Sequence, residues 1–285
     1  MDRSFIKPTL RFLPGAVLAL LAGMVVAKAQ EPAPEAIVDA MEKNSGTHAG
    51  KRRSGAKGVC ASGEFVSNGA GARLTNAAPF QPGGRFPVMA RFSNGGGNPQ
   101  APDNAPGVRG LSLAFTLPGN DSFEMVMINV PAFGASTPES FVRLLQSRAP
   151  DPTTGRPDPQ RIAAADAQNP EWAVQPNYLR TNSPPASYAT APFFSVNSFV
   201  FQNAAGEKRH LRWNFEPVAG RAVLTPEERT ARGADFLQNE LRERVGRAPA
   251  EWRMMVQLPR EGDPLLSATA IWPADREQVE VGLLR

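Results

Sequence analysis

Alternation of apolar and polar residues is the clearest pattern along this chain. In residues 109–117, Leu111, Leu113, Phe115 and Leu117 alternate with small or polar residues, which is the period of a β-strand with one buried face. A first strand is expected from Cys60 onward. Similar runs predict further strands at residues 86–93, 123–130, 193–202, 210–217, 252–258 and 267–271. The sequence Asn-Ala-Ala-Gly at 203–206 predicts a hairpin turn between two of them.

Helical periodicity predicts helices between the groups of strands, at residues 35–44, 137–148, 158–168 and 225–245. Thr137 with Pro138, and Thr225 with Glu228, are expected to begin two of these helices, because a threonine hydroxyl caps a first helical turn. The rest of 149–192 is rich in proline and asparagine and predicts an irregular arm. Strands in runs with helices inserted between them indicate an α+β fold. A closed barrel would leave no strand with a free edge, but periodicity alone does not establish closure.

The length and the first residues predict one exported domain. The chain has 285 residues and no internal repeat, which suits a single domain at residues 35–285 after a tether at 30–34. Residues 1–29 resemble a cleavable secretory signal, because basic residues precede an apolar run that ends in Ala27-Lys28-Ala29. The expected location is periplasmic or secreted. An uncleaved membrane anchor is the alternative, although the apolar run is short for a membrane span.

Charge and cysteine content exclude several classes of function. Residues 1–29 hold four cations and one acid, so their removal reduces the formal net charge from +4 to about +1. The mature domain therefore has no basic excess that would indicate nucleic acid as a partner. Cys60 is the single cysteine, which rules out an intrachain disulfide, and its apolar neighbours favour a buried thiol. Two separated histidines and one cysteine make no zinc site.

The densest cluster of candidate chemistry lies at residues 46–65, GTHAGKRRSGAKGVCASGEF. This stretch holds His48, one of two histidines, and the cations Lys51, Arg52, Arg53 and Lys57. Arginine recognises carboxylate or phosphate through paired hydrogen bonds, so the cluster is a candidate anion site. The alternative reading is a solvated basic turn.

The same stretch resembles the catalase superfamily, in particular the bacterial catalase-related peroxidases, whose pattern is G-x-H-P-G-x-R-x-x-H-A-K-G-V-C-x-x-G-x-F. Further matches follow in the same order along the chain: Ala90 to Ser93, Thr137 to Phe141, Asn197 to Gly206, Asp263-Pro264, Ile271-Trp272-Pro273 and Val281-Gly282. Each match alone is weak, whereas their order and spacing together are specific. The resemblance implies a catalase-like antiparallel β-barrel with inserted and flanking helices.

The resemblance also implies a haem cofactor and assigns residues to it. Arg52 and Arg91 would bind the haem propionates, because a guanidinium pairs with a carboxylate through two parallel bonds. Ser93 would be a hydrogen-bonding group near the peroxide, and Phe141 would lie against the porphyrin. The ordinary alternatives are a surface arginine, a strand serine and a core phenylalanine.

Two departures from the family pattern bear on catalysis. Gly55 stands where the family carries its distal catalytic histidine, and that histidine moves a proton between the peroxide oxygens. The family places its axial tyrosine downstream of the V-G segment, in an R-x-x-x-Y pattern. This sequence reaches Arg285 without it, so the C-terminal part is expected to be truncated and no metal-ligating residue is assigned. The family pattern makes His48 structural, and a catalytic role for His48 is the open alternative.

The resemblance therefore implies an enzyme, a haem-dependent peroxidase that reduces hydrogen peroxide or organic peroxides with a small reductant. Its expected role is defence against oxidative stress. The alternative is a non-catalytic catalase-like barrel that binds haem or an apolar ligand, or a truncated product that retains no haem. Neither nucleic acid nor a stable membrane anchor is expected, and the oligomeric state cannot be read from the sequence.

Overall fold

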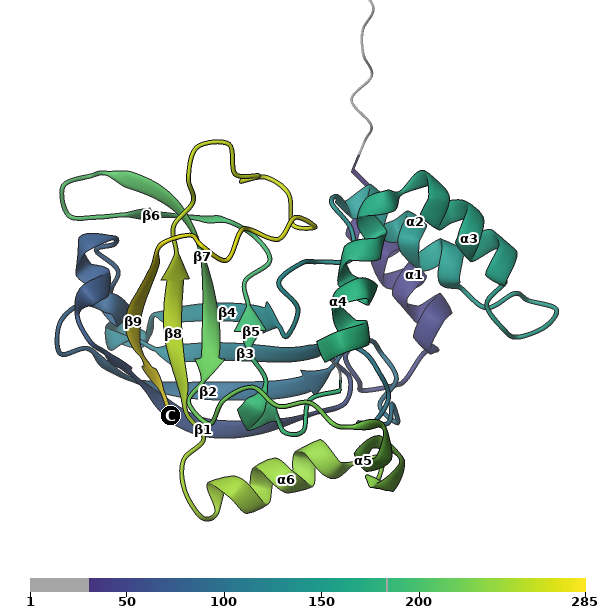
Figure 1. Cartoon of the computed structure of the whole chain (residues 1–285), viewed down its shortest axis with the longest axis horizontal. Coiled ribbons are helices and arrows are strands. Elements are labelled where there is room, and N and C mark those ends of the chain that lie inside the picture. Colours follow the sequence, from purple (N-terminus) through teal and green to yellow (C-terminus); the bar gives the residue numbers. More distant parts are fainter. Residues whose placement is uncertain (1–30, 183) are drawn as a thin grey trace, which may run out of the picture. The chain divides into compact units, whose positions relative to one another are not determined.

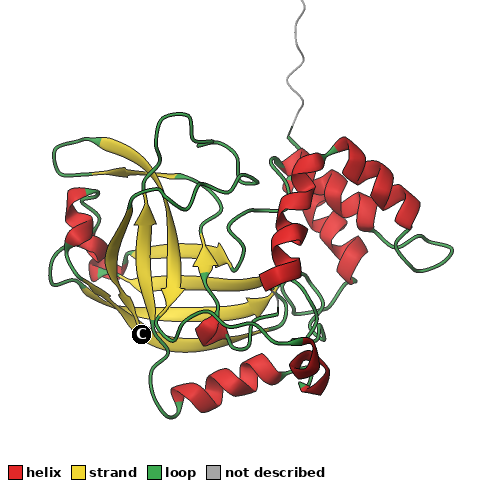
Figure 2. Ribbon diagram, viewed as in Figure 1, coloured by secondary structure: helices red, strands yellow, loops and turns green. Residues whose placement is uncertain are grey.

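Eight antiparallel strands close into a barrel in this computed structural model, which describes residues 31–182 and 184–285 (Figure 2). In ring order the strands are β1 (Gly58–Ser67), β2 (Arg85–Asn94), β3 (Arg109–Thr116), β4 (Ser122–Ile128), β5 (Phe193–Phe194), β7 (Lys208–Pro217), β8 (Trp252–Gln257) and β9 (Gln278–Leu284). Pairing of β5 with β7 and of β1 with β9 closes the ring. The expected α+β fold with a catalase-like barrel is confirmed. The predicted signal lies outside the described residues, and the domain boundaries stay predictions.

The barrel interior is filled by every second side chain of each strand. On β3, Leu111, Leu113 and Phe115 are at most 1% exposed, whereas Gly110 and Ser112 face outward and are half-buried. Full burial of such an apolar side chain stabilises the fold by about 1.5 to 3 kcal/mol. The interior is thus a packed core, and the outer strand faces are left to line a site.

Two groups of helices accompany the barrel (Figure 1). The first group contains α1 (Pro34–Ser45), α2 (Pro138–Arg148), α3 (Pro159–Gln168) and α4 (Val174–Asn182), and the second contains α5 (Pro226–Ala231) and α6 (Phe236–Val245). Short 3-10 turns are η1 (Ala70–Arg73), η2 (Ala78–Phe80), η3 (Pro118–Asn120), η4 (Pro170–Ala173) and η5 (Tyr188–Thr190). No helix of the described residues is long and apolar enough to cross a membrane.

The predicted helix starts are confirmed, but one predicted helix is divided. Thr137 accepts a hydrogen bond from the Ser140 amide, and Thr225 forms a capping box at the start of α5. The helix expected at 225–245 breaks between α5 and α6, where Gly233 disfavours helix. There the Ala234 carbonyl accepts a hydrogen bond from the Asp103 amide, at 2.8 Å, instead of continuing the helix.

Other differences lie in the second half of the barrel. The strand expected at 193–202 is interrupted between β5 and β6 (Phe199–Gln202), where the Ser195 hydroxyl accepts from the Trp213 amide at 2.9 Å. The prediction of a strand at 267–271 is wrong. The carbonyls of Ser267 and Ala270 accept hydrogen bonds from the Arg212 guanidinium instead of pairing with another strand. The last strand, β9, was not predicted. The arm at 149–192, which was expected to be irregular outside 158–168, also contains the helix α4.

The burial predicted for Cys60 is also wrong. The thiol is exposed on the outer face of β1. Phe65 points into the barrel, and Cys60 lies an odd number of positions from it, so the two side chains lie on opposite faces of the strand. The Cys60 Cα lies opposite that of Arg91 on β2.

Candidate active site

A cavity of about 650 Å³ lies against the outer faces of β2, β3 and β4. Its other walls come from α1, α2 and the segment that runs from η4 into α4. The apolar part of the lining includes Met41, Val126, Ile128, Phe133, Phe141, Leu144, Leu145 and Trp172. Four arginines also line it, Arg52, Arg53, Arg91 and Arg148, together with Gly55, Gly95, Gly96, Gly110 and Gly134. The cavity thus combines an apolar body with a cationic margin, at a size typical of a site for a large organic ligand.

Five of the six residues predicted from the sequence line this cavity: Arg52, Gly55, Arg91, Ser93 and Phe141. Strand alternation explains why Arg91 and Ser93 face outward into the cavity. Ala90 and Phe92, which alternate with them along β2, point into the barrel core. Phe141 reaches the cavity from α2, where its ring lies 5.3 Å from that of Phe133.

His48 is the sixth predicted residue, and the structure does not bring it to the cavity lining. Its ring Nε2 lies 2.9 Å from the Ser45 carbonyl at the end of α1. The geometry therefore gives His48 a local role in holding the chain after α1.

Arg52 and Arg91 bring two positive charges to one corner of the cavity. In the described part of the chain neither guanidinium forms an ion pair with an acidic residue. Burial lowers the pKa of Arg91 below its usual value, and the charge of Arg52 lowers it further. Two like charges without a counter-ion favour an anionic group between them.

Gly55 lies in the same corner. Its backbone has a φ of +63°, and a Cβ at this position would lie 3.1 Å from the Ser93 Oγ and 3.3 Å from the Arg91 Nη1. A side chain at 55 would therefore begin beside the Ser93 hydroxyl. Any residue other than glycine would also carry backbone strain there.

Arg148 and Trp172 are among the lining residues that the sequence did not predict. Arg148 and Phe141 are seven positions apart on α2, so they share a helix face, and this periodicity could have identified Arg148. Trp172 comes from the low-pattern arm, which carries no such signal. Its Nε1 donates to the Ser140 hydroxyl at 2.9 Å, and the Arg148 guanidinium lies 5.4 Å from the centre of its ring.

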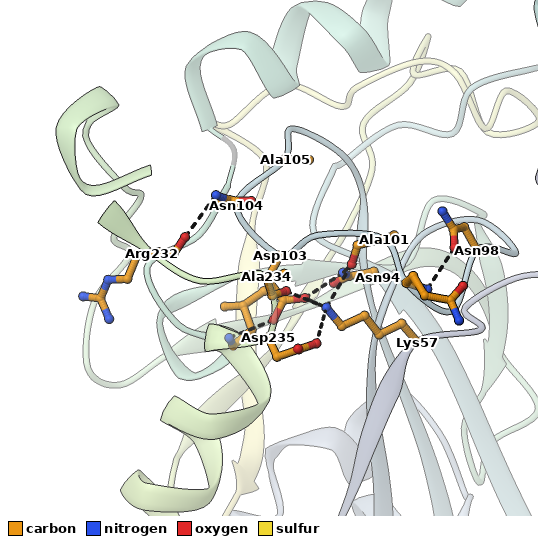
Figure 3. A network of polar contacts seen from close by, with 12 residues as sticks. Lys57, Asn94, Asn98, Ala101, Asp103, Asn104, Ala105, Arg232, Ala234 and Asp235 are labelled. Atoms are coloured by element: carbon orange, nitrogen blue, oxygen red, sulfur yellow. Dashed lines mark hydrogen bonds and ion pairs between the residues drawn. The ribbon is translucent and has the colours of Figure 1, made fainter. Parts of the chain in front are cut away.

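An ion network around the buried Lys57 and Asp103 adjoins the cavity wall (Figure 3). Asn94 lines the cavity, and its amide donates to Asp103 at 2.8 Å. The Lys57 ammonium lies 2.7 Å from the Asp103 carboxylate and 2.9 Å from that of Asp235. Tyr188 donates to Asn94 at 3.2 Å, and burial raises the pKa of its phenol. This network joins the start of β1 to α6 and to the end of β2.

The lining fits one part of a haem group and leaves another unassigned. The apolar wall and the two arginines without acidic partners suit a flat apolar ring that carries carboxylates. Among the described residues that line the cavity there is no tyrosine, histidine or cysteine, and methionine, a less common ligand of haem iron, is present as Met41 and Met127. The described residues also contain no group of three histidine, cysteine or acidic side chains that could hold a metal ion.

Comparisons with known proteins identify one family. A family model described as Catalase matches residues 35–279. A catalase-related peroxidase of Synechococcus elongatus is 39% identical over 278 residues, which cover 96% of this chain and 82% of that protein. A catalase-related peroxidase of Mycolicibacterium paratuberculosis is 32% identical over 240 residues, with 84% of this chain and 75% of that protein covered.

Longer proteins match over a smaller share of their length. A catalase of Vibrio parahaemolyticus is 30% identical over 230 residues, and the match covers 76% of this chain but 45% of that protein. The crystal structure of a fungal catalase superposes with a TM-score of 0.75 at 23% identity, covering 82% of this chain and 50% of the fungal chain. At this identity the superposition supports the fold alone.

Proposed function

This chain belongs to the catalase family, and we propose that it is a haem-dependent peroxidase that reduces hydrogen peroxide or organic peroxides with a small reductant. The cavity beside β2, β3 and β4 is the haem site of this proposal. Its support is that five residues from three separate segments of the chain line one cavity: Arg52, Gly55, Arg91, Ser93 and Phe141.

In this proposal the described residues bind and orient the cofactor. Arg52 and Arg91 hold carboxylates at the cationic corner, and Phe141 packs against the flat ring. The Ser93 hydroxyl has no hydrogen-bond partner in the described part of the chain, so it is available to a peroxide oxygen. Bound haem would supply the redox chemistry that cleaves the O–O bond.

A second candidate function is haem binding without turnover. Gly55 favours it, because glycine offers no group to move a proton between the peroxide oxygens. General acid-base catalysis contributes about 10²- to 10⁴-fold to a rate, so its loss would leave a slow enzyme or none.

Haemin titration followed by the absorption band of the bound porphyrin tests the site. We expect Arg52→Ala to weaken binding by about 1.5 to 3 kcal/mol, the range for hydrogen bonds to a charged group. Lys51→Ala is the matched control, because Lys51 is an adjacent exposed cation that does not line the cavity. Equal affinity of Arg52→Ala and Lys51→Ala would contradict the site.

Peroxide consumption by the haemin-loaded chain separates the two candidates. The enzyme proposal requires consumption of hydrogen peroxide or of cumene hydroperoxide, with a phenolic reductant, faster than by the same concentration of free haemin. Saturable haemin binding with a rate no higher than that of free haemin would establish the second candidate instead.

A further inference from the structure

The side of α2 that lines the cavity is apolar over two turns and ends in a cation. Four residues at the spacing of one helix face make up this side, and all of them line the cavity: Phe141, Leu144, Leu145 and Arg148. At a rise of 1.5 Å per residue, the first and the last of them lie about 10 Å apart along the helix axis. A molecule that lies along this face therefore meets an apolar wall and then a positive charge.

Contacts with its neighbours hold the Arg148 guanidinium at the cavity margin. Its Nη1 donates to the Ser147 hydroxyl at 2.6 Å, and its Cζ lies 5.4 Å from the ring centre of Trp172. Trp172 is 2% exposed and is itself fixed, because its Nε1 donates to the Ser140 hydroxyl at 2.9 Å. The cation is thus in place before a ligand arrives, which reduces the entropy that binding costs.

The acidic partner of Arg148 is a carboxylate that a ligand can replace. Nη2 of Arg148 lies 2.6 Å from Oδ1 of Asp166 on α3, and the two side chains are 29% and 45% exposed. Water screens an ion pair of this exposure, so the pair contributes little to stability. A carboxylate that enters the cavity with an apolar body therefore exchanges with Asp166 at little cost.

We propose that Arg148 is a specificity-determining residue for organic peroxides that carry a carboxylate on an apolar body. The body packs against the apolar face of α2, and the carboxylate displaces Asp166 from Arg148. This inference rests on the proposed function for the reaction and deepens it by naming the substrate class. Hydrogen peroxide has neither an apolar body nor a carboxylate, so Arg148 does not affect its reduction.

Kinetics with the haemin-loaded full chain test the proposal, because the two partners of the ion pair should have opposite effects. The substrates are linoleic acid hydroperoxide, its methyl ester and hydrogen peroxide. Arg148→Gln should raise KM for the acid about 10-fold, near the lower end for a hydrogen bond to a charged group. Asp166→Asn should lower the same KM by about 2- to 5-fold, since the competing carboxylate is gone.

Two controls separate this role from a structural one. In both variants kcat for the acid, and KM for the ester and for hydrogen peroxide, should change less than about 2-fold, because Arg148 binds only the remote end of the acid. Arg143→Gln is the matched control, since Arg143 is an exposed arginine of the same helix that does not line the cavity. It should change none of these constants.

Shifts of KM in the same direction for Arg148→Gln and Asp166→Asn would overturn the proposal, because loss of a purely structural ion pair affects both variants alike. Equal effects on the acid and its ester would also overturn it. Weaker binding of haemin by Arg148→Gln, with unchanged binding of haemin dimethyl ester, would assign Arg148 to the cofactor instead.

A second measurement needs no turnover. In calorimetric titration of the full chain with linoleic acid, which has no peroxide group, Arg148→Gln should weaken binding about 10-fold and Asp166→Asn should strengthen it. Equal affinity of the wild type and both variants would overturn the proposal. If the haemin-loaded wild type consumes no peroxide, the proposed function fails, while this titration still decides whether Arg148 binds the carboxylate.

Discussion

Lys57→Met perturbs the ion network beside the cavity wall without removing much of the side chain's volume. Lys57 is 6% exposed and Asp103 is fully buried, and their charged groups lie 2.7 Å apart. Methionine fills the space of the lysine stem but leaves the Asp103 carboxylate without the ammonium that forms an ion pair with it. Removing one partner of a buried pair costs about 3 to 5 kcal/mol, because an uncompensated charge stays in the interior. For a domain of this size the melting temperature should fall by about 6 to 20 °C.

Urea unfolding followed by tryptophan fluorescence measures this loss. The midpoint should fall while the slope with denaturant stays unchanged, since the surface exposed on unfolding is the same. Arg73→Met is the control, because its ion pair with Glu277 is solvent-exposed and the substitution should change stability by less than about 1 kcal/mol. If Lys57→Met and Arg73→Met unfold at the same urea concentration, the network does not stabilise the fold as argued.

Two further predictions concern single residues, and a third concerns the N-terminus. Gly55→Ala should destabilise the fold by about 1 to 2 kcal/mol of backbone strain, and its Cβ would also make a close contact with Ser93. Gly83→Ala is the control, because its φ is also positive, at +74°, but its Cβ would meet no atom within 4 Å. Equal urea midpoints for the two variants would contradict this prediction. Burial raises the pKa of Tyr188, so above about pH 10 the unfolded chain loses a proton that the folded chain keeps, and stability falls as pH rises. Tyr188→Phe should lessen that fall between pH 9 and 11, and an unchanged pH dependence would refute it. Finally, the exported protein should begin at Gln30 by intact mass, and retention of the first residues would exclude cleavage there.

The site residues were predicted from the resemblance to the catalase superfamily, and strand alternation explains why two of them face the cavity. Arg91 and Ser93 occupy outward positions of β2 because Phe92 and its alternate neighbours are core residues, and that pattern is visible in the sequence. Closure of the barrel was not visible, since it depends on pairing between strands far apart in the chain, such as Phe193 with Phe215.

Errors arose where side chains compete for backbone groups. The segment 267–271 has the composition of a strand, but its carbonyls accept hydrogen bonds from Arg212, and no local pattern reports that contact. The strand β9 was not predicted, although Val279 and Val281 alternate with polar residues there. Trp172 reaches the cavity through a contact with Ser140, 32 positions away, which lies beyond any periodic pattern.

If haem acts within the cavity beside β2, β3 and β4, a side chain that fills this cavity must stop peroxide consumption. Val126 lines this cavity and is 74% exposed, so Val126→Trp would fill the cavity without disturbing the barrel core. Glu124→Trp is the matched control, because Glu124 is the next outward residue on β4 and does not line the cavity. The decisive measurement is peroxide consumption by each protein loaded with one equivalent of haemin. We expect wild type and Glu124→Trp to consume peroxide faster than free haemin, and Val126→Trp to consume it at the rate of free haemin. An undiminished rate in Val126→Trp would show that haem does not act in this cavity.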